Sequence, residues 1–236
     1  HDAGFQEGET ISHGDETLRF GRNRPRSPIK PVRHALGAVA ALGGGLLYLL
    51  RGVWTDAAIP AVAAALCFCL SMAALYAASA IYHYYPGTAA SGGVKRVLRK
   101  MDHSMIYVLI AGSYTPFCVV LLPQPRGTQF CLILWGVALA GVLAKMLWIN
   151  APRMLSTAVY LIMGWSVVFV AKDFTALGQP CLTLVALGGI CYSVGAVFYA
   201  VKKPNISAEW TFHELFHLLI LAGSFFHYLA VYLYVL

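Results

Sequence analysis

Seven long apolar windows constrain the fold of this chain more than any other feature of its sequence. They fall at residues 35–55, 57–85, 102–122, 128–149, 154–173, 180–201 and 210–236. Each has at least the roughly 20 residues that an α-helix needs to cross a hydrocarbon core of about 30 Å. Charged residues make up only 11% of the chain and apolar residues 59%, a balance that soluble domains do not show. We therefore predict an all-α membrane protein with seven transmembrane helices.

The composition divides the chain into two parts. Residues 1–33 are polar and lack an apolar periodicity, so we expect a disordered N-terminal tail. Residues 34–236 are expected to form one seven-helix transmembrane domain. The six cysteines lack CxxC spacing and mostly lie within apolar windows, which is typical of small packing residues. They do not predict a disulfide or a thiolate metal site.

Lysine and arginine predict how the helices are oriented. If the helices alternate strictly, fourteen of the 17 basic residues lie on the side of the amino terminus, and three lie on the other: Arg51, Arg126 and Lys172. Positively charged loops remain in the cytoplasm, so the N-terminus is predicted to be cytoplasmic and the C-terminus outside. The expected location is the plasma (inner) membrane. The net charge of +7 is then a topology signal, and no aromatic residues accompany the basic ones as nucleic-acid binding would require.

Histidines occur where a membrane helix would not normally carry them. His213 and His217 are four residues apart, so they project from one face of a helix about 6 Å apart along its axis. His83 is predicted near the inner end of the second helix, and His34 opens the first helix on the same side. Ionisable groups inside a membrane are costly and mark functional sites. The imidazoles of His83, His213 and His217 therefore predict a metal site at the inner membrane rim.

The donor set indicates what such a metal could do. Zinc with three histidine ligands and one open position lowers the pKa of its water to about 7. Asp102, predicted at the inner end of the third helix, could hold that water and take its proton. Ser79 lies one turn before His83 and could polarise a substrate carbonyl. Imidazoles also bind iron, copper or nickel, but zinc suits hydrolysis best, and inside a membrane the natural substrate is a lipid ester or amide.

These residues resemble a known family. Ser79 and His83, Asp102, and His213 and His217 match the three motifs of the hemolysin III branch of the progestin and adipoQ receptor (PAQR) family. The resemblance runs from about residue 34 to the end of the chain. It implies a seven-helix fold with the N-terminus inside, a zinc ion on the three histidines, and Asp102 acting through water.

The resemblance also implies kinship with adiponectin receptors and alkaline ceramidases. The partners expected on that basis are membrane lipids, with ceramide or another sphingolipid as substrate and a fatty acid as product; no protein partner is indicated. One motif departs from the family. An acidic residue and an asparagine precede the first-helix histidine in the family, whereas Ser27 and Lys30 precede His34 in this chain.

Three other functions remain open from the sequence. Zinc could be structural in a receptor or a regulator of membrane lipid homeostasis. The chain could form a pore, although its helices show no continuous polar stripe. His213 to His217 also matches H-E-x-x-H, in which Glu214 would be the general base of an intramembrane metalloprotease, but that reading leaves His83 without a role.

Several of these residues also have purely structural interpretations. Asp102 could cap the amino end of a helix, and Ser79 could serve helix packing. His227 lies ten residues beyond His217, toward the outer half, and is expected to be a packing group. His103 is expected to be interfacial and to point away from the metal.

Overall fold

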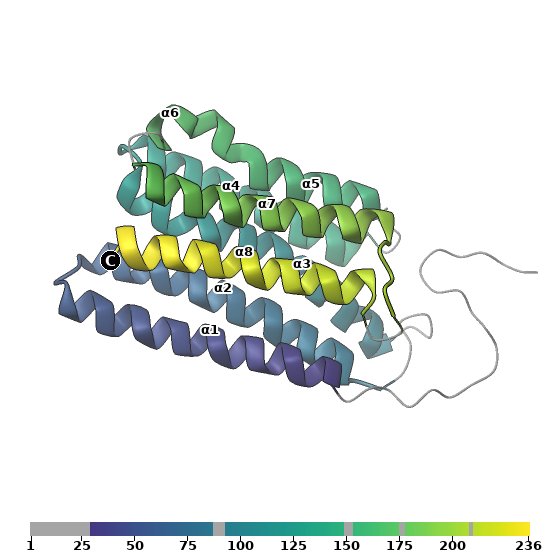
Figure 1. Cartoon of the computed structure of the whole chain (residues 1–236). Helices are drawn as coiled ribbons and strands as arrows, with labels where there is room; N and C mark the ends of the chain where they lie inside the picture. The colour runs from purple at the N-terminus through teal and green to yellow at the C-terminus, as the bar shows by residue number, and fades with distance from the viewer. Residues whose placement is uncertain (1–28, 87–92, 149–152, 175–177, 208–209) are drawn as a thin grey trace, which may run out of the picture.

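The computed structural model describes residues 29–86, 93–148, 153–174, 178–207 and 210–236, and within these ranges all regular secondary structure is helical. Figure 1 shows long helices running alongside one another as a bundle. The all-α prediction is therefore confirmed for the described part of the chain. The N-terminal tail, apart from its last five residues, lies outside it. Those five residues are helical, because the first helix begins at Ile29.

Every predicted window contains helix. The elements are α1 (Ile29–Trp54), α2 (Ile59–Tyr84), α3 (Gly93–Pro116) with a π-helical end (Phe117–Leu121), α4 (Arg126–Leu147), α5 (Arg153–Trp165) with a 3₁₀ end (Ser166–Val170), α6 (Ala171–Phe174), α7 (Gln179–Val201) and α8 (Phe212–Tyr234). Six of the described helical spans are long and apolar enough to cross a membrane. Large apolar side chains such as Leu132, Leu139 and Leu147 are exposed on the outside, as lipid contact requires. The chain is a multi-pass integral membrane protein.

The fifth window is interrupted, which the sequence did not predict. Its apolar helix runs from Met154 to Val170 and changes from α to 3₁₀ at Ser166. The cause is a hydroxyl from α3: Tyr114 Oη donates to the Gly164 carbonyl (2.6 Å) and accepts from the Val167 N–H (3.1 Å). A side chain inserted into the backbone ladder in this way breaks the α-helical pattern.

The third helix begins earlier than its apolar window. Basic residues that were expected in a loop, among them Lys95 and Lys100, belong to the first two turns of α3. They bind carbonyl oxygens at neighbouring helix ends: Lys100 Nζ donates to Met146 (2.6 Å), and Lys95 Nζ to Tyr82 and Tyr85. Because α3 starts at Gly93, Asp102 lies in its third turn rather than at its start.

Close contacts tie α1 to α2 and α8. A Cβ built at Gly37 would lie 3.0 Å from the Tyr76 ring, so small residues let α1 approach α2. The rings of Tyr48 on α1 and Tyr228 on α8 stack on each other. The Tyr48 hydroxyl donates to the Tyr228 carbonyl (3.0 Å), and the Tyr228 hydroxyl donates to the Gly44 carbonyl (3.1 Å). In this arrangement the start of α1, the end of α2 and the start of α8 meet at one end of the bundle (Figure 1).

Candidate metal centre

Three helix ends place four histidines together. His34 is in the second turn of α1, His83 is the residue before the last of α2, and His213 and His217 occupy the first two turns of α8. The start of α8 is fixed by a capping box in which the Glu214 carboxylate accepts hydrogen bonds from the Thr211 backbone N–H (3.2 Å) and hydroxyl. This cap fixes where α8 begins, and therefore the position of His213 and His217 along the axis of the bundle.

The nitrogens of the three predicted ligands face one another. Nε2 of His213 lies 3.3 Å from Nε2 of His83 and 3.1 Å from Nε2 of His217. Ligand nitrogens at 2.0–2.1 Å from a tetrahedral ion are separated by about 3.3 Å, so both distances match the edges of such a site. The structure thus brings His83, His213 and His217 together, as predicted from their positions in the chain.

Hydrogen bonding alone does not account for this arrangement. One nitrogen of a neutral imidazole offers either a single N–H or a single lone pair. Nε2 of His213 therefore cannot form ordinary hydrogen bonds with two nitrogens at once. A cation that accepts a lone pair from each ring satisfies all three nitrogens. His217 is also buried, at 8% exposure, and its Nδ1 has no hydrogen-bond partner. The donor set therefore fits a divalent metal ion.

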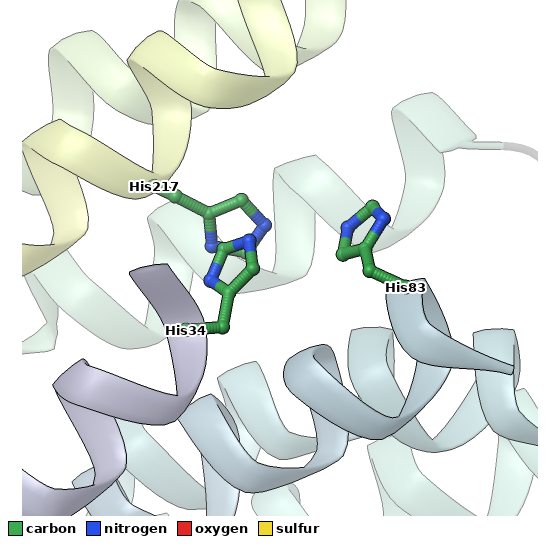
Figure 2. A group of neighbouring side chains, drawn as sticks. All are labelled: His34, His83 and His217. Carbon is green, nitrogen blue, oxygen red and sulfur yellow. The ribbon is translucent and has the colours of Figure 1, made fainter. Parts of the chain in front are cut away.

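His34 is a fourth member that the predicted ligand set does not include. Ligand nitrogens of His34, His83 and His217 all lie within 4.8 Å of one another. Figure 2 shows these three rings converging from α1, α2 and α8. The His34 ring centroid is 4.4 Å from that of His217 and 5.2 Å from that of His83. The signal for His34 in the sequence was its depth, which places it at the same end of the bundle as the other three.

Two candidate ligand sets therefore share His83 and His217 and differ in the third histidine. In one set the third is His213, whose Nε2 lies 3.3 Å from that of His83 and 3.1 Å from that of His217. In the other set the third is His34. All four imidazoles together would fill a tetrahedral shell, whereas three would leave a position open.

Asp102 and Ser79 form a buried polar pair beside this end of α2. Asp102 is 2% exposed and Ser79 0% exposed, and neither Asp102 Oδ1 nor Ser79 Oγ has a hydrogen-bond partner by distance and angle. Ser79 and the Lys95 ammonium are the electrostatic neighbours of the Asp102 carboxylate. Ser79 stands one turn before His83 on α2. Because Asp102 lies in the third turn of α3, it does not cap that helix.

The remaining polar residues have different surroundings. Glu214 is engaged in the capping box, so its carboxylate serves the start of α8, and the metalloprotease reading loses its general base. His103, expected to be interfacial, is half-buried, and its Nε2 lies 3.2 Å from the hydroxyl of Tyr199 on α7. His227 is buried against α7, as expected of a packing residue, with its Nε2 3.1 Å from the Val185 carbonyl.

A cavity of about 380 Å³ is present in the bundle, and none of the four clustered histidines lines it. It lies between α3, α5, α7 and α8 and is lined mainly by apolar and aromatic side chains. Phe216, which precedes His217, belongs to its wall. Its size is within the range of roughly 300–1,000 Å³ that is usual for small-molecule sites.

The sequence of this chain is similar to those of several known proteins. Residues 23–228 match the family model described as Haemolysin-III related. The chain is 32% identical over 208 residues to Hemolysin-3 of Bacillus cereus, covering 87% of this chain and 90% of that protein. It is 38% identical over 158 residues to the Hemolysin-3 homolog of Bacillus subtilis, covering 66% and 70%. It is 25% identical over 220 residues to the Adiponectin receptor protein of Drosophila melanogaster, covering 83% of this chain and 47% of that protein.

Proposed function

Because this chain belongs to the haemolysin-III-related branch of the PAQR family, as its motifs predicted, we propose that it is a zinc-dependent hydrolase of lipid amides. The substrate class we propose is ceramide or a related sphingolipid, with a fatty acid as product. The observation that carries the proposal is the convergence of imidazole nitrogens at 3.1–3.3 Å from α2 and α8. The apolar cavity between α3, α5, α7 and α8 supports a substrate with a long hydrocarbon chain.

We assign the metal to His83, His213 and His217, which leave a fourth position for chemistry. When bound there, zinc supplies Lewis-acid chemistry that makes hydroxide available near neutral pH. Asp102 would take a proton from the attacking water, whose oxygen would bond the amide carbonyl carbon. The carbon–nitrogen bond would then break to give the fatty acid, and the same carboxyl would return the proton to the leaving amine. The Ser79 hydroxyl orients the Asp102 carboxylate or donates to the substrate carbonyl.

We also propose that this end of the bundle faces the cytoplasm. The amino-terminal side carries fourteen of the 17 lysines and arginines, so the N-terminus is inside and the C-terminus outside. The plasma membrane is the proposed location. Reporter fusions at Leu236 and in the segment before Ile29 test this topology, and a C-terminal reporter that is active in the cytoplasm contradicts it.

The activity is tested with purified protein in lipid nanodiscs. Wild-type protein is expected to contain about one zinc per chain by elemental analysis and to release fatty acid from ceramide. His213→Ala is expected to lose both the metal and the release. His227→Gln is the matched control for metal content, because it changes another buried histidine of α8 that lies against α7. Full turnover by the His213→Ala protein refutes the proposal.

The fourth imidazole favours a second candidate function. If His34 also binds the ion, the coordination shell is closed, as in structural zinc sites. The ion would then tie α1, α2 and α8 together in a receptor or a regulator of membrane lipid homeostasis. In that case the His34→Ala protein loses the metal and unfolds at a lower temperature. The wild-type protein then releases no fatty acid from ceramide. Under the hydrolase proposal His34→Ala retains the zinc.

The name of the Bacillus relatives points to a third activity, lysis of cells by a pore. Leakage of a dye from liposomes that contain the purified protein tests it directly. The described helices give it little support, because their exposed faces are apolar. We therefore rank it below the other two.

A further inference from the structure

The candidate metal centre requires that the end of α2 and the start of α8 hold fixed positions. Nε2 of His83 lies 3.3 Å from Nε2 of His213, and these side chains come from the last turn of α2 and the first turn of α8. Helix ends fray, because their terminal backbone groups lack partners within the helix. The capping box of Glu214 fixes the start of α8. The end of α2 needs a corresponding contact.

A lysine from α3 supplies that contact. Lys95 Nζ donates to the carbonyl oxygen of Tyr82 and to that of Tyr85 (2.7 Å), so one ammonium holds the backbone just before and just after His83. Carbonyl oxygens at the end of a helix carry its negative partial charge, and a lysine is a favourable partner for them. The same nitrogen lies 4.3 Å from the centroid of the Tyr82 ring, and that ring is 4.9 Å from the ring of His83. Lys95 thus fixes the turn of α2 that carries His83.

The charge of Lys95 is offset by two negative groups. Lys95 and Asp102 are seven residues apart, so they lie on one face of α3, about 10 Å apart along its axis. The Asp102 carboxylate has the Lys95 ammonium as an electrostatic neighbour. The ammonium therefore interacts with a carboxylate and with the negative end of α2. These interactions allow a positive charge to lie near a site for a metal cation.

The end of α4 shows the same kind of contact without a candidate ligand. Lys100 Nζ donates to the carbonyl oxygen of Met146, the residue before the last of that helix (2.6 Å). The sequence of α4 contains no histidine. Two lysines of α3 thus bind the ends of two helices, and only the end bound by Lys95 carries a candidate metal ligand. Lys100 is therefore the matched control for Lys95.

We propose that Lys95 is a positioning residue of the metal centre: its two bonds to the end of α2 hold His83 at the distance from His213 and His217 that a metal ion requires. The inference rests on the metal assignment proposed above, and it adds a residue that none of the three sequence motifs contains. Charge and position predict opposite effects when the ammonium is removed. On charge alone, the protein without it binds a divalent cation more tightly. With the end of α2 released, binding is instead weaker, because the metal must also order the turn that carries His83, which costs conformational entropy.

The experiment measures metal affinity in four full-length proteins: wild type, Lys95→Met, Lys95→Arg and Lys100→Met. Each is purified in the same nanodiscs, stripped of metal with a chelator and titrated with cobalt(II), whose visible absorption reports the coordination geometry. Zinc affinity is then measured by competition with the bound cobalt. Thermal unfolding of the metal-free proteins shows how much each substitution weakens the fold itself.

Lys95→Met is expected to bind cobalt and zinc about 10–100-fold more weakly than wild type and to change the cobalt spectrum, as is usual when a group that orients a ligand is lost. Lys95→Arg, which keeps the charge and the N–H donors, is expected to restore most of the affinity. Lys100→Met is expected to lose thermal stability as Lys95→Met does, but to keep the wild-type affinity and spectrum. Equal or tighter binding by Lys95→Met overturns the proposal, and so does an equal loss of affinity in Lys100→Met.

A milder pair of variants keeps the test decisive if Lys95→Met does not fold. Lys95→Gln retains an N–H donor on a shorter side chain, and it is expected to bind cobalt up to about tenfold more weakly than Lys100→Gln. Equal affinities in these two proteins overturn the proposal. None of these measurements requires turnover, so a failure to hydrolyse ceramide does not affect them. A wild-type protein that binds no metal overturns both the proposed function and the role of Lys95, whereas equal metal binding by wild type and Lys95→Met overturns only the role of Lys95.

Discussion

Gly188→Ala tests the contact between α7 and α8 on which the position of His227 depends. A Cβ at Gly188 would lie 2.3 Å from Cδ2 and 2.4 Å from Nε2 of His227, and 3.0 Å from the Gly223 carbonyl oxygen. Ordinary van der Waals contact begins at 3.4 Å. The added methyl group therefore overlaps the imidazole by more than 1 Å, and either the ring or the helix must move.

Neither movement is cheap. The ring is buried and donates to the Val185 carbonyl, and α7 is held at this height by the close approach of Gly188 to Gly223. Overpacking of this kind costs about 1–3 kcal/mol, and a lost hydrogen bond adds about 1 kcal/mol. We expect Gly188→Ala to destabilise the protein by about 2–4 kcal/mol. For a chain of this length that lowers the melting temperature by roughly 5–15 °C.

The next residue provides the matched control. A Cβ at Gly189 has nothing within 4 Å, so Gly189→Ala makes the same chemical change on the same helix without an overlap. Its melting temperature is expected to equal or slightly exceed that of wild type, because alanine favours helix more than glycine does. Thermal unfolding of the three proteins in one detergent measures the difference. If Gly188→Ala is as stable as Gly189→Ala, the described packing of α7 on α8 is incorrect.

Three further predictions concern the metal centre. His34→Ala should retain about one zinc per chain and His213→Ala should lose it, as measured by elemental analysis; the opposite result would assign the ion to the His34 set. Asp102→Asn should lower fatty-acid release by about 10²–10⁴-fold while the zinc content stays unchanged. If the zinc content falls as much as the fatty-acid release, Asp102 has a structural role and is not the general base. Removing the metal with a chelator should lower the melting temperature of wild type but not that of His213→Ala, because a ligand that binds only the folded state stabilises it.

The sequence alone determined the helical windows, the membrane setting and the family. Hydropathy over 20 residues and the four-residue spacing of a helix are local properties, so they can be read without knowing which helices touch. The same local rules placed His83, His213 and His217 at one end of the bundle, because alternating helices bring every second helix end to the same side. The positions of these three histidines in the structure agree with that reasoning.

Contacts between different helices decided the rest. His34 joins the cluster because α1 packs against α2 and α8, and the early start of α3 puts Asp102 in the third turn of α3 beside Ser79, where no window boundary would place it. The fifth span is interrupted because a tyrosine hydroxyl from α3 enters its backbone ladder. Likewise, the partner of His227 is the Val185 carbonyl of α7, which lies 42 positions away in the sequence. Each of these features depends on side chains far apart in sequence, and only the tertiary structure brings them together.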